Sequence, residues 1–127
     1  MERKIVSADS AFADVVGYSR TVRVGEHVFV AGTAPVMADR SAPPTHAYGQ
    51  AQRCLEIIVA ALKEVGAGPE HVVRTRIYLT NGDDITEVGR AHGEVFNDAR
   101  PVTTALVVKE LLDPRWVVEI EAEAVVH

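Results

Sequence analysis

Alternation of apolar and polar residues is the clearest pattern in this chain, and it is strictest in residues 116–126. The apolar positions of this segment are Val118, Ile120, Ala122 and Ala124, and the polar positions are Glu119, Glu121 and Glu123. Successive side chains of a strand point to opposite faces of its sheet. The pattern therefore predicts a strand that packs one face on a core and presents carboxylates from the other.

Five earlier segments are short and rich in β-branched or aromatic residues, which predicts further strands. They are residues 4–7, 18–24, 27–31, 72–80 and 102–109. The last of these is so rich in Val, Thr and Leu that we expect it to be largely buried. In residues 72–80, alternation places Val73, Thr75, Ile77 and Leu79 on one face and Val72, Arg74, Arg76 and Tyr78 on the other.

Apolar residues recur every three or four positions in two segments, which predicts two helices. The first spans residues 45–66, with Thr45 as a plausible N-cap and Gly66 at its end. The second spans residues 85–97 and follows Asp83 and Asp84, either of which could cap it. Residues 8–17 and 33–45 hold small residues or prolines, and we expect both to be loops.

The predicted order β-β-β-α-β-α-β-β indicates an α+β domain spanning residues 1–127. Both helices connect strands, so we expect one mixed six-stranded sheet with the two helices on one face. The other face would carry Thr, Arg, Ala and Glu together with apolar side chains. A face of this mixed character is typical of an interface between subunits.

Composition narrows the function classes. The net charge of −5 and the absence of a basic cluster argue against nucleic-acid binding, because phosphate contacts need grouped Lys and Arg. The apolar runs are too short to span a bilayer, and the N-terminus has no signal-peptide core. The single cysteine, Cys54, precludes an intramolecular disulfide and fits a cytoplasmic location. The five histidines show no metal-binding spacing, so we expect neither a metal nor a cofactor.

Several segments, in order along the chain, resemble the RidA/YjgF family of reactive-intermediate deaminases, also described as endoribonuclease L-PSP-like. They are residues 18–25 (YSRTVRVG), 28–32 (VFVAG), 73–80 (VRTRIYLT), 100–104 (RPVTT) and 118–122 (VEIEA), together with the long helix. The resemblance implies a chorismate-mutase-like fold and a homotrimer with three clefts between subunits. It also implies hydrolysis of small imines or enamines to ketoacids and ammonia.

The resemblance assigns roles position by position. The family's aromatic cleft residue matches Tyr18, and its carboxylate that holds the attacking water matches Glu119. The backbone around Gly32 lies near the same cleft. The arginine that grips the substrate carboxylate, two positions after the proline, is replaced here by Thr103. This chain therefore keeps the frame of the pocket and lacks its main substrate contact.

Five further positions complete the predicted substrate pocket: Ala31, Gly89, His92, Arg100 and Thr104. Family residues at four of these are a serine (Ala31), an asparagine (Gly89), a tyrosine (His92) and a polar residue (Thr104). Arg100 precedes the proline and could, with His92, line the pocket for a different ligand. The alternative is a solvated arginine at the end of a helix, which is the more common situation.

Two functions remain open at this stage. The chain could be a deaminase of small imines with Glu119 as its acid–base group and with Thr103 and Thr104 shaping the pocket. It could instead be a trimeric small-molecule-binding protein without chemistry. Ribonuclease activity ranks third, because the sequence shows no pair of general-base histidines and its negative charge opposes RNA.

Overall fold

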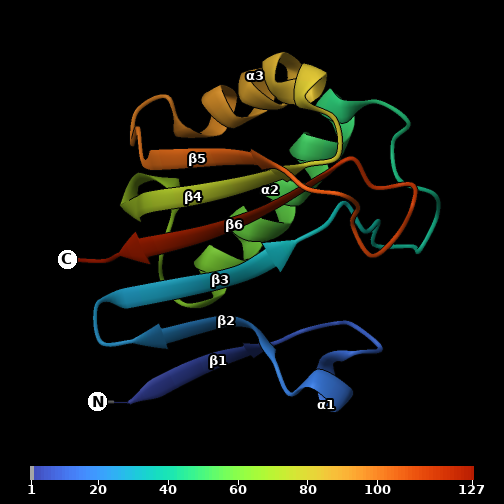
Figure 1. The fold of residues 1–127 in the computed structure, drawn as a ribbon. Helices are drawn as coiled ribbons and strands as arrows, with labels where there is room; N and C mark the ends of the chain where they lie inside the picture. Colours follow the sequence, from blue (N-terminus) through green and yellow to red (C-terminus); the bar gives the residue numbers. More distant parts are fainter. Residues whose placement is uncertain (1) are drawn as a thin grey trace.

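A computed structural model describes residues 2–127, and its single sheet has six strands in the order β1-β2-β3-β6-β4-β5 (Figure 1). The strands are β1 (Arg3–Ser7), β2 (Ser19–Val24), β3 (His27–Thr33), β4 (Val72–Leu79), β5 (Val102–Val107) and β6 (Val118–Val125). The β4–β5 pair is parallel and every other neighbouring pair is antiparallel. The predicted mixed six-stranded sheet is confirmed.

Two long helices cover one face of this sheet. They are α2 (Ala47–Glu64) and α3 (Ile85–Phe96), and Figure 1 shows α2 lying across the back of the sheet. The apolar stripe of α2 packs on β3 and β6, and its buried members include Leu55, Ile58 and Leu62. The predicted α+β arrangement, with both main helices on one face, is therefore confirmed. Within residues 2–127, no helix is long and apolar enough to cross a bilayer.

Local details at the helix ends differ from the predictions. Residues 8–17 contain a one-turn helix, α1 (Ala13–Val16), where only a loop was expected. The N-cap of α2 is His46, not Thr45, and its Nδ1 accepts a hydrogen bond from the Gly49 amide at 3.1 Å. An imidazole nitrogen can thus replace the usual hydroxyl cap. Asp84 occupies the N-cap position of α3 but makes no capping bond with its side chain.

A bulge at the start of β4 reverses the predicted faces of its first two residues. The register against β6 shifts between Val72 and Arg74. Val72 is consequently buried with Thr75 and Ile77, whereas Val73 is 46% exposed. Strict alternation therefore placed each of these two valines on the wrong face of the sheet. The bulge inserts one residue, and an inserted residue exchanges the faces of all positions before it.

β5 lies at the edge of the sheet, and all six of its residues are exposed. Val102, Leu106 and Val107 expose between 50% and 62% of their surface. The expectation of a largely buried strand is wrong for the isolated chain, since β5 has one neighbouring strand and lies beyond the cover of α2. An exposed apolar edge strand is a surface that proteins normally cover.

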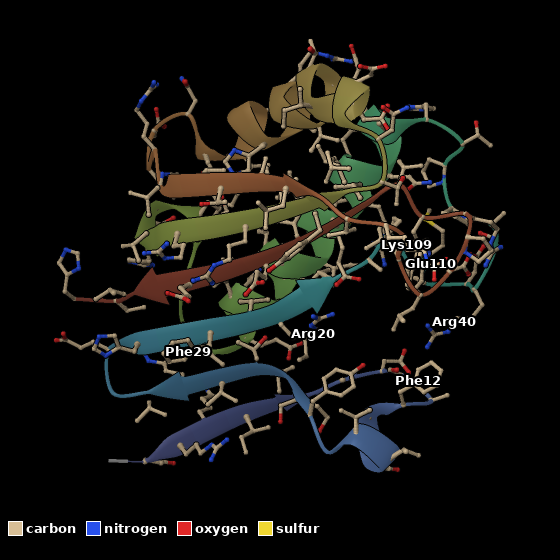
Figure 2. All side chains as sticks on the ribbon, viewed as in Figure 1. Phe12, Arg20, Phe29, Arg40, Lys109 and Glu110 are labelled. Carbon is tan, nitrogen blue, oxygen red and sulfur yellow. The ribbon has the colours of Figure 1, made fainter. Side chains whose placement is uncertain are left out.

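The sheet face turned away from α2, here called the open face, mixes apolar and charged side chains. On one side lies Phe29 of β3, 48% exposed and labelled in Figure 2. The centre carries Glu119, Glu121 and Glu123 of β6 opposite Tyr78, Arg76 and Arg74 of β4. Beyond them, the register places Val102, Thr104 and Leu106 of β5 on the same face. The predicted alternation of β6 is confirmed in full.

Candidate functional site

Glu119 is the first carboxylate on the open face of β6, and it lies beside the end of β3. The register of β3 against β6 is irregular between Val30 and Thr33. In this stretch Gly32 leaves room for the carboxylate, because a Cβ placed on Gly32 would lie 2.6 Å from Glu119 Oε2. Any side chain at position 32 would push the carboxylate away. Glycine here allows the carboxylate to lie directly against the backbone of β3.

Arg20 of β2 belongs to the same site, although it is not among the residues predicted from the sequence. Its Nη2 donates hydrogen bonds to the carbonyl oxygens of Ala31 at 2.8 Å and Gly32 at 2.9 Å. Figure 2 shows Arg20 near the end of β3. Burial lowers the pKa of its guanidinium, while the nearby Tyr18 and Glu119 oppose this shift. Arg20 lies two residues after Tyr18 along the chain, but nothing in this spacing marks its contact with the carbonyls of Ala31 and Gly32.

Glu119 differs from the two carboxylates that follow it on β6, because those two form ion pairs. Arg76 Nη1 lies 3.3 Å from Glu121 Oε2 and 3.2 Å from Glu123 Oε1. The Tyr78 hydroxyl also donates to Glu121. Among residues 2–127, Glu119 has neither an ion pair nor a hydrogen-bond partner of its own. It is therefore the carboxylate of this row that remains available to a water molecule or a ligand.

The surroundings of Glu119 also favour its protonated form. Burial raises the pKa of the Glu119 carboxyl above its ordinary value, and the charge of Glu121 adds to this effect. The guanidinium of Arg20 acts in the opposite direction. A carboxyl whose pKa moves towards neutrality can both accept and return a proton, which is the requirement for a general acid–base group.

A second polar cluster links three elements near the β5 edge. Thr75 of β4 is fully buried, and its Oγ1 lies 2.8 Å from Nε2 of His92 on α3. The same Oγ1 lies 2.8 Å from Oγ1 of Thr103 on β5. Burial lowers the pKa of His92, whose ring packs at 4.7 Å from that of Phe96. A neutral imidazole is thus connected through a buried hydroxyl to the exposed hydroxyl of Thr103.

The two clusters lie on opposite faces of the sheet. Thr103 pairs with Thr75, so its side chain is on the face that the helices cover. Glu119 is on the open face, as is Thr104, which pairs with Arg76. One chain therefore brings Glu119 together with Gly32 and with Arg20, which in turn contacts Ala31 and lies near Tyr18. It also brings His92 together with Thr103 through Thr75, but it does not bring the two groups into one site.

The remaining predicted positions lie on the surface. Gly89 is exposed on α3, and no other atom lies within 4 Å of the place a Cβ would occupy. Arg100 has a positive φ of 49°, and its Nη1 lies 3.3 Å from Oδ1 of Asn97. In the isolated chain Arg100 is thus an exposed arginine at the end of α3, as the second of its two interpretations described. Tyr18 is 37% exposed.

Three hollows on residues 2–127 have linings that do not include Glu119. One of them, of about 570 Å³, lies between residues 37–44 and the first turns of α2. Its lining includes Asp39, His46 and Arg53 but none of the predicted site residues. These hollows therefore do not identify the candidate site, which is defined by Glu119 and its neighbours Gly32 and Arg20.

Comparisons with known proteins agree on one protein family and one fold. The endoribonuclease L-PSP family model matches residues 8–126. An uncharacterized protein of Streptomyces coelicolor is 40% identical over 119 residues, covering 94% of this chain and 89% of that protein. A Mycobacterium tuberculosis member of the YjgF/YER057c/UK114 family has a crystal structure that matches with a TM-score of 0.89. Its sequence identity is 42%, over 98% of this chain and 100% of that chain. The structure of Escherichia coli TdcF with bound serine shares the fold, with a TM-score of 0.82 and 22% identity over 97% of this chain and 94% of that one.

Proposed function

The chain belongs to the endoribonuclease L-PSP family, the RidA/YjgF family, and on this premise we propose that it is a hydrolase that deaminates small reactive imines or enamines. Family membership supports a role in processing small molecules. The specific reaction, the catalytic role of Glu119 and the assembly into a homotrimer are parts of the proposal.

The observation that carries this proposal is the environment of Glu119. Its carboxylate is half-buried against Gly32, next to Arg20, and among residues 2–127 it has no ion pair of the kind that Glu121 and Glu123 form. A structural carboxylate in a partly buried place is normally paired, because leaving it unpaired is costly. An unpaired carboxylate with a raised pKa is the state expected of a group that activates water.

The chemistry needs one group that takes and returns a proton twice. Glu119 takes a proton from water as the oxygen attacks the C=N carbon and passes it to the nitrogen, which yields a neutral tetrahedral aminoalcohol. The carboxylate then takes the hydroxyl proton of this intermediate and gives it to the nitrogen as the C–N bond breaks, so that ammonia leaves while the carbonyl forms. The reaction consumes one water per imine and involves no change of oxidation state, so Glu119 begins and ends each cycle as a carboxylate.

A homotrimer would explain why the open face exposes apolar residues and why Glu119 and Thr103 lie on opposite faces of one sheet. The face combines exposed apolar residues, such as Phe29 and Leu106, with a row of charge pairs, which is typical of a surface covered in an assembly. Packing of this face and of the β5 edge against neighbouring copies could place Glu119 of one chain near Thr103 of the next. The measurement is the molar mass in solution by light scattering, and a monomer would contradict the proposal.

The alternative is a binding protein of the same fold that performs no chemistry. It is favoured by the threonine at position 103, where the resemblance implies an arginine for gripping a carboxylate. The related TdcF was solved with bound serine, which shows a small polar ligand in a protein of this fold. Retention of a ligand without turnover would support this second function.

The test is ammonia release from 2-aminoacrylate and from its uncharged counterpart 2-aminoacrylamide, measured above the spontaneous rate. We expect Glu119→Gln to lower kcat by about 10²–10⁴-fold, the usual contribution of a general acid–base group. Glu123→Gln is the matched control, since it removes a carboxylate from the same face that is paired with Arg76. Equal losses in both variants, or no turnover by the wild-type protein, would contradict the proposed hydrolase.

A further inference from the structure

The hydrogen-bonded series of His92, Thr75 and Thr103 is unusual because it connects a partly buried imidazole to the edge of the sheet through a buried hydroxyl, without any charged member. Each of its two bonds is 2.8 Å long. Thr75 is 0% exposed and belongs to the central part of the sheet, whereas Thr103 lies on the exposed edge strand. The series thus passes through the core at Thr75 and ends at Thr103, where a ligand could reach it.

Both end members of this hydrogen-bonded series, His92 and Thr103, are uncharged near pH 7. Burial is the cause that lowers the pKa of His92, so its imidazole is neutral near pH 7. Within residues 2–127, none of the three members hydrogen-bonds to a lysine, arginine or carboxylate. Arg74 and Arg76, which flank Thr75, lie on the opposite face of β4 and pair with Glu121 and Glu123. Arg100, three residues before Thr103, directs Nη1 to Oδ1 of Asn97.

We propose that His92, Thr75 and Thr103 form a neutral relay that selects an uncharged carbonyl group in the ligand, a carboxamide in particular, and disfavours a carboxylate. This inference rests on the proposed function, because it takes Thr103 to line the same cleft as Glu119 of another chain. Thr103 is the residue that touches the ligand. Thr75 and His92 are positioning residues that act through it.

The hydrogen bonds of the relay can be donated in either of two directions, and a carboxamide can pair with Thr103 in both. With a proton on Nε2, the imidazole donates to Thr75, Thr75 donates to Thr103, and the Thr103 hydroxyl donates to a ligand oxygen. Its internal acceptor in this direction is the Pro101 carbonyl, at 3.2 Å. Without a proton on Nε2, every bond reverses and Thr103 offers a lone pair to a ligand N–H. A carboxamide has both an acceptor and a donor.

A carboxylate pairs poorly with Thr103 in either direction of donation. A carboxylate in a closed cleft loses hydration that only a cation or several strong donors can replace. One hydroxyl supplies at most one neutral hydrogen bond and no positive charge. Position 103 therefore discriminates by leaving the charge of a carboxylate uncompensated, as specific sites commonly do.

Packing alone does not explain the hydroxyl group of Thr75. Valine has nearly the same shape as threonine and would fill the same space between β4 and α3 without any need for partners. The hydroxyl of Thr75 is satisfied only because His92 and Thr103 lie on its two sides. Its effect is to hold the Thr103 hydroxyl in one orientation before the ligand arrives, which lowers the cost of binding.

The test compares two probes that differ only in this group, pyruvate and pyruvamide, in NMR titrations of the full chain. We expect the wild-type protein to bind pyruvamide about five- to tenfold more tightly, which is at the lower end of the penalty for an unpaired charge. Thr103→Arg should reverse the preference. Thr75→Val should weaken pyruvamide binding by about fivefold and leave pyruvate binding unchanged, while Thr75→Ser should restore it.

Rescue by Thr75→Ser separates positioning from structure, since a purely structural role would tolerate valine as well as serine. The relay is refuted if pyruvate binds at least as tightly as pyruvamide, or if Thr75→Val retains the wild-type preference. Repeating the titrations in Glu119→Gln keeps this test independent of turnover. A preference for pyruvamide in a protein that hydrolyses no imine would reject the proposed hydrolase and leave the relay standing.

Discussion

The contact between Glu119 and Gly32 yields the sharpest test of the proposed site. In the variant Gly32→Ala, the new Cβ would lie 2.6 Å from Glu119 Oε2 and 3.4 Å from its Cδ. An ordinary contact begins near 3.4 Å, so the carboxylate oxygen must move by about 0.8 Å. The atom that must move is the end of a flexible side chain, so the strand itself can stay in place.

The effects on stability and on activity should therefore differ greatly. Turning the Glu119 side chain away from its preferred rotamer costs about 0.5–1.5 kcal/mol. Replacing glycine by alanine within a strand returns about 0.5–1 kcal/mol through the unfolded state. The two terms nearly cancel, and Tm should stay within about 4 °C of wild type. A displacement of nearly 1 Å at a reacting group, by contrast, should lower kcat by about 10–100-fold.

The assay pairs ammonia release with thermal unfolding, and Gly93→Ala is the matched control. Gly93 lies in α3 with open space around the added Cβ. We expect this control to gain about 0.5–1 kcal/mol in stability and to keep its activity. If Gly32→Ala retains the wild-type kcat, the carboxylate position does not matter and the proposed role of Glu119 is wrong. If the variant fails to fold, the backbone of β3 is less tolerant than this geometry indicates.

Three further outcomes follow from the burial of Glu119, Gln50 and Cys54. Because burial raises the folded-state pKa of Glu119, its stabilising contribution is complete below its unfolded pKa and is lost as pH rises through the folded value. Urea unfolding should thus find Glu119→Gln more stable than wild type at pH 8 and equal to it near pH 4, and an unchanged difference would contradict the shift. Gln50 is 1% exposed and makes three hydrogen bonds of 2.8 Å to backbone groups of Pro44, Arg115 and Val117. Gln50→Leu should lower the free energy of unfolding by about 2–4 kcal/mol, because it leaves these groups unpaired, and a loss under 1 kcal/mol would show that water replaces the amide. Burial strongly raises the pKa of the Cys54 thiol, so iodoacetamide should label it only in urea, and labelling of the folded protein would show local opening.

Periodicity by itself determined the main elements of this protein. The helical spacing of apolar residues in α2 and the strict alternation in β6 both specify which side chains face the core, because each period fixes the direction of every side chain in a regular element. Element order was then enough to indicate a mixed sheet with two helices on one face. The resemblance added Gly32 and Glu119, which the structure brings into direct contact, and Tyr18, which lies near Arg20.

Features that depend on neighbouring strands could not be predicted locally. β5 has the composition of a buried strand but lies at the edge of the sheet, since its environment is set by strand order and by what covers the edge. The bulge in β4 exchanged the faces of Val72 and Val73, because register is a property of a strand pair and not of one strand.

Tertiary structure alone decided the composition of the two polar clusters. Arg20 reaches the carbonyls of Ala31 and Gly32 from a neighbouring strand, and no motif in the sequence marks that contact. His92, Thr75 and Thr103 belong to a helix and two strands that meet only when α3 packs beside β4 and β5. Local periodicity specifies which way a side chain points, whereas its hydrogen-bond partner is chosen by the packing of elements that are far apart along the chain.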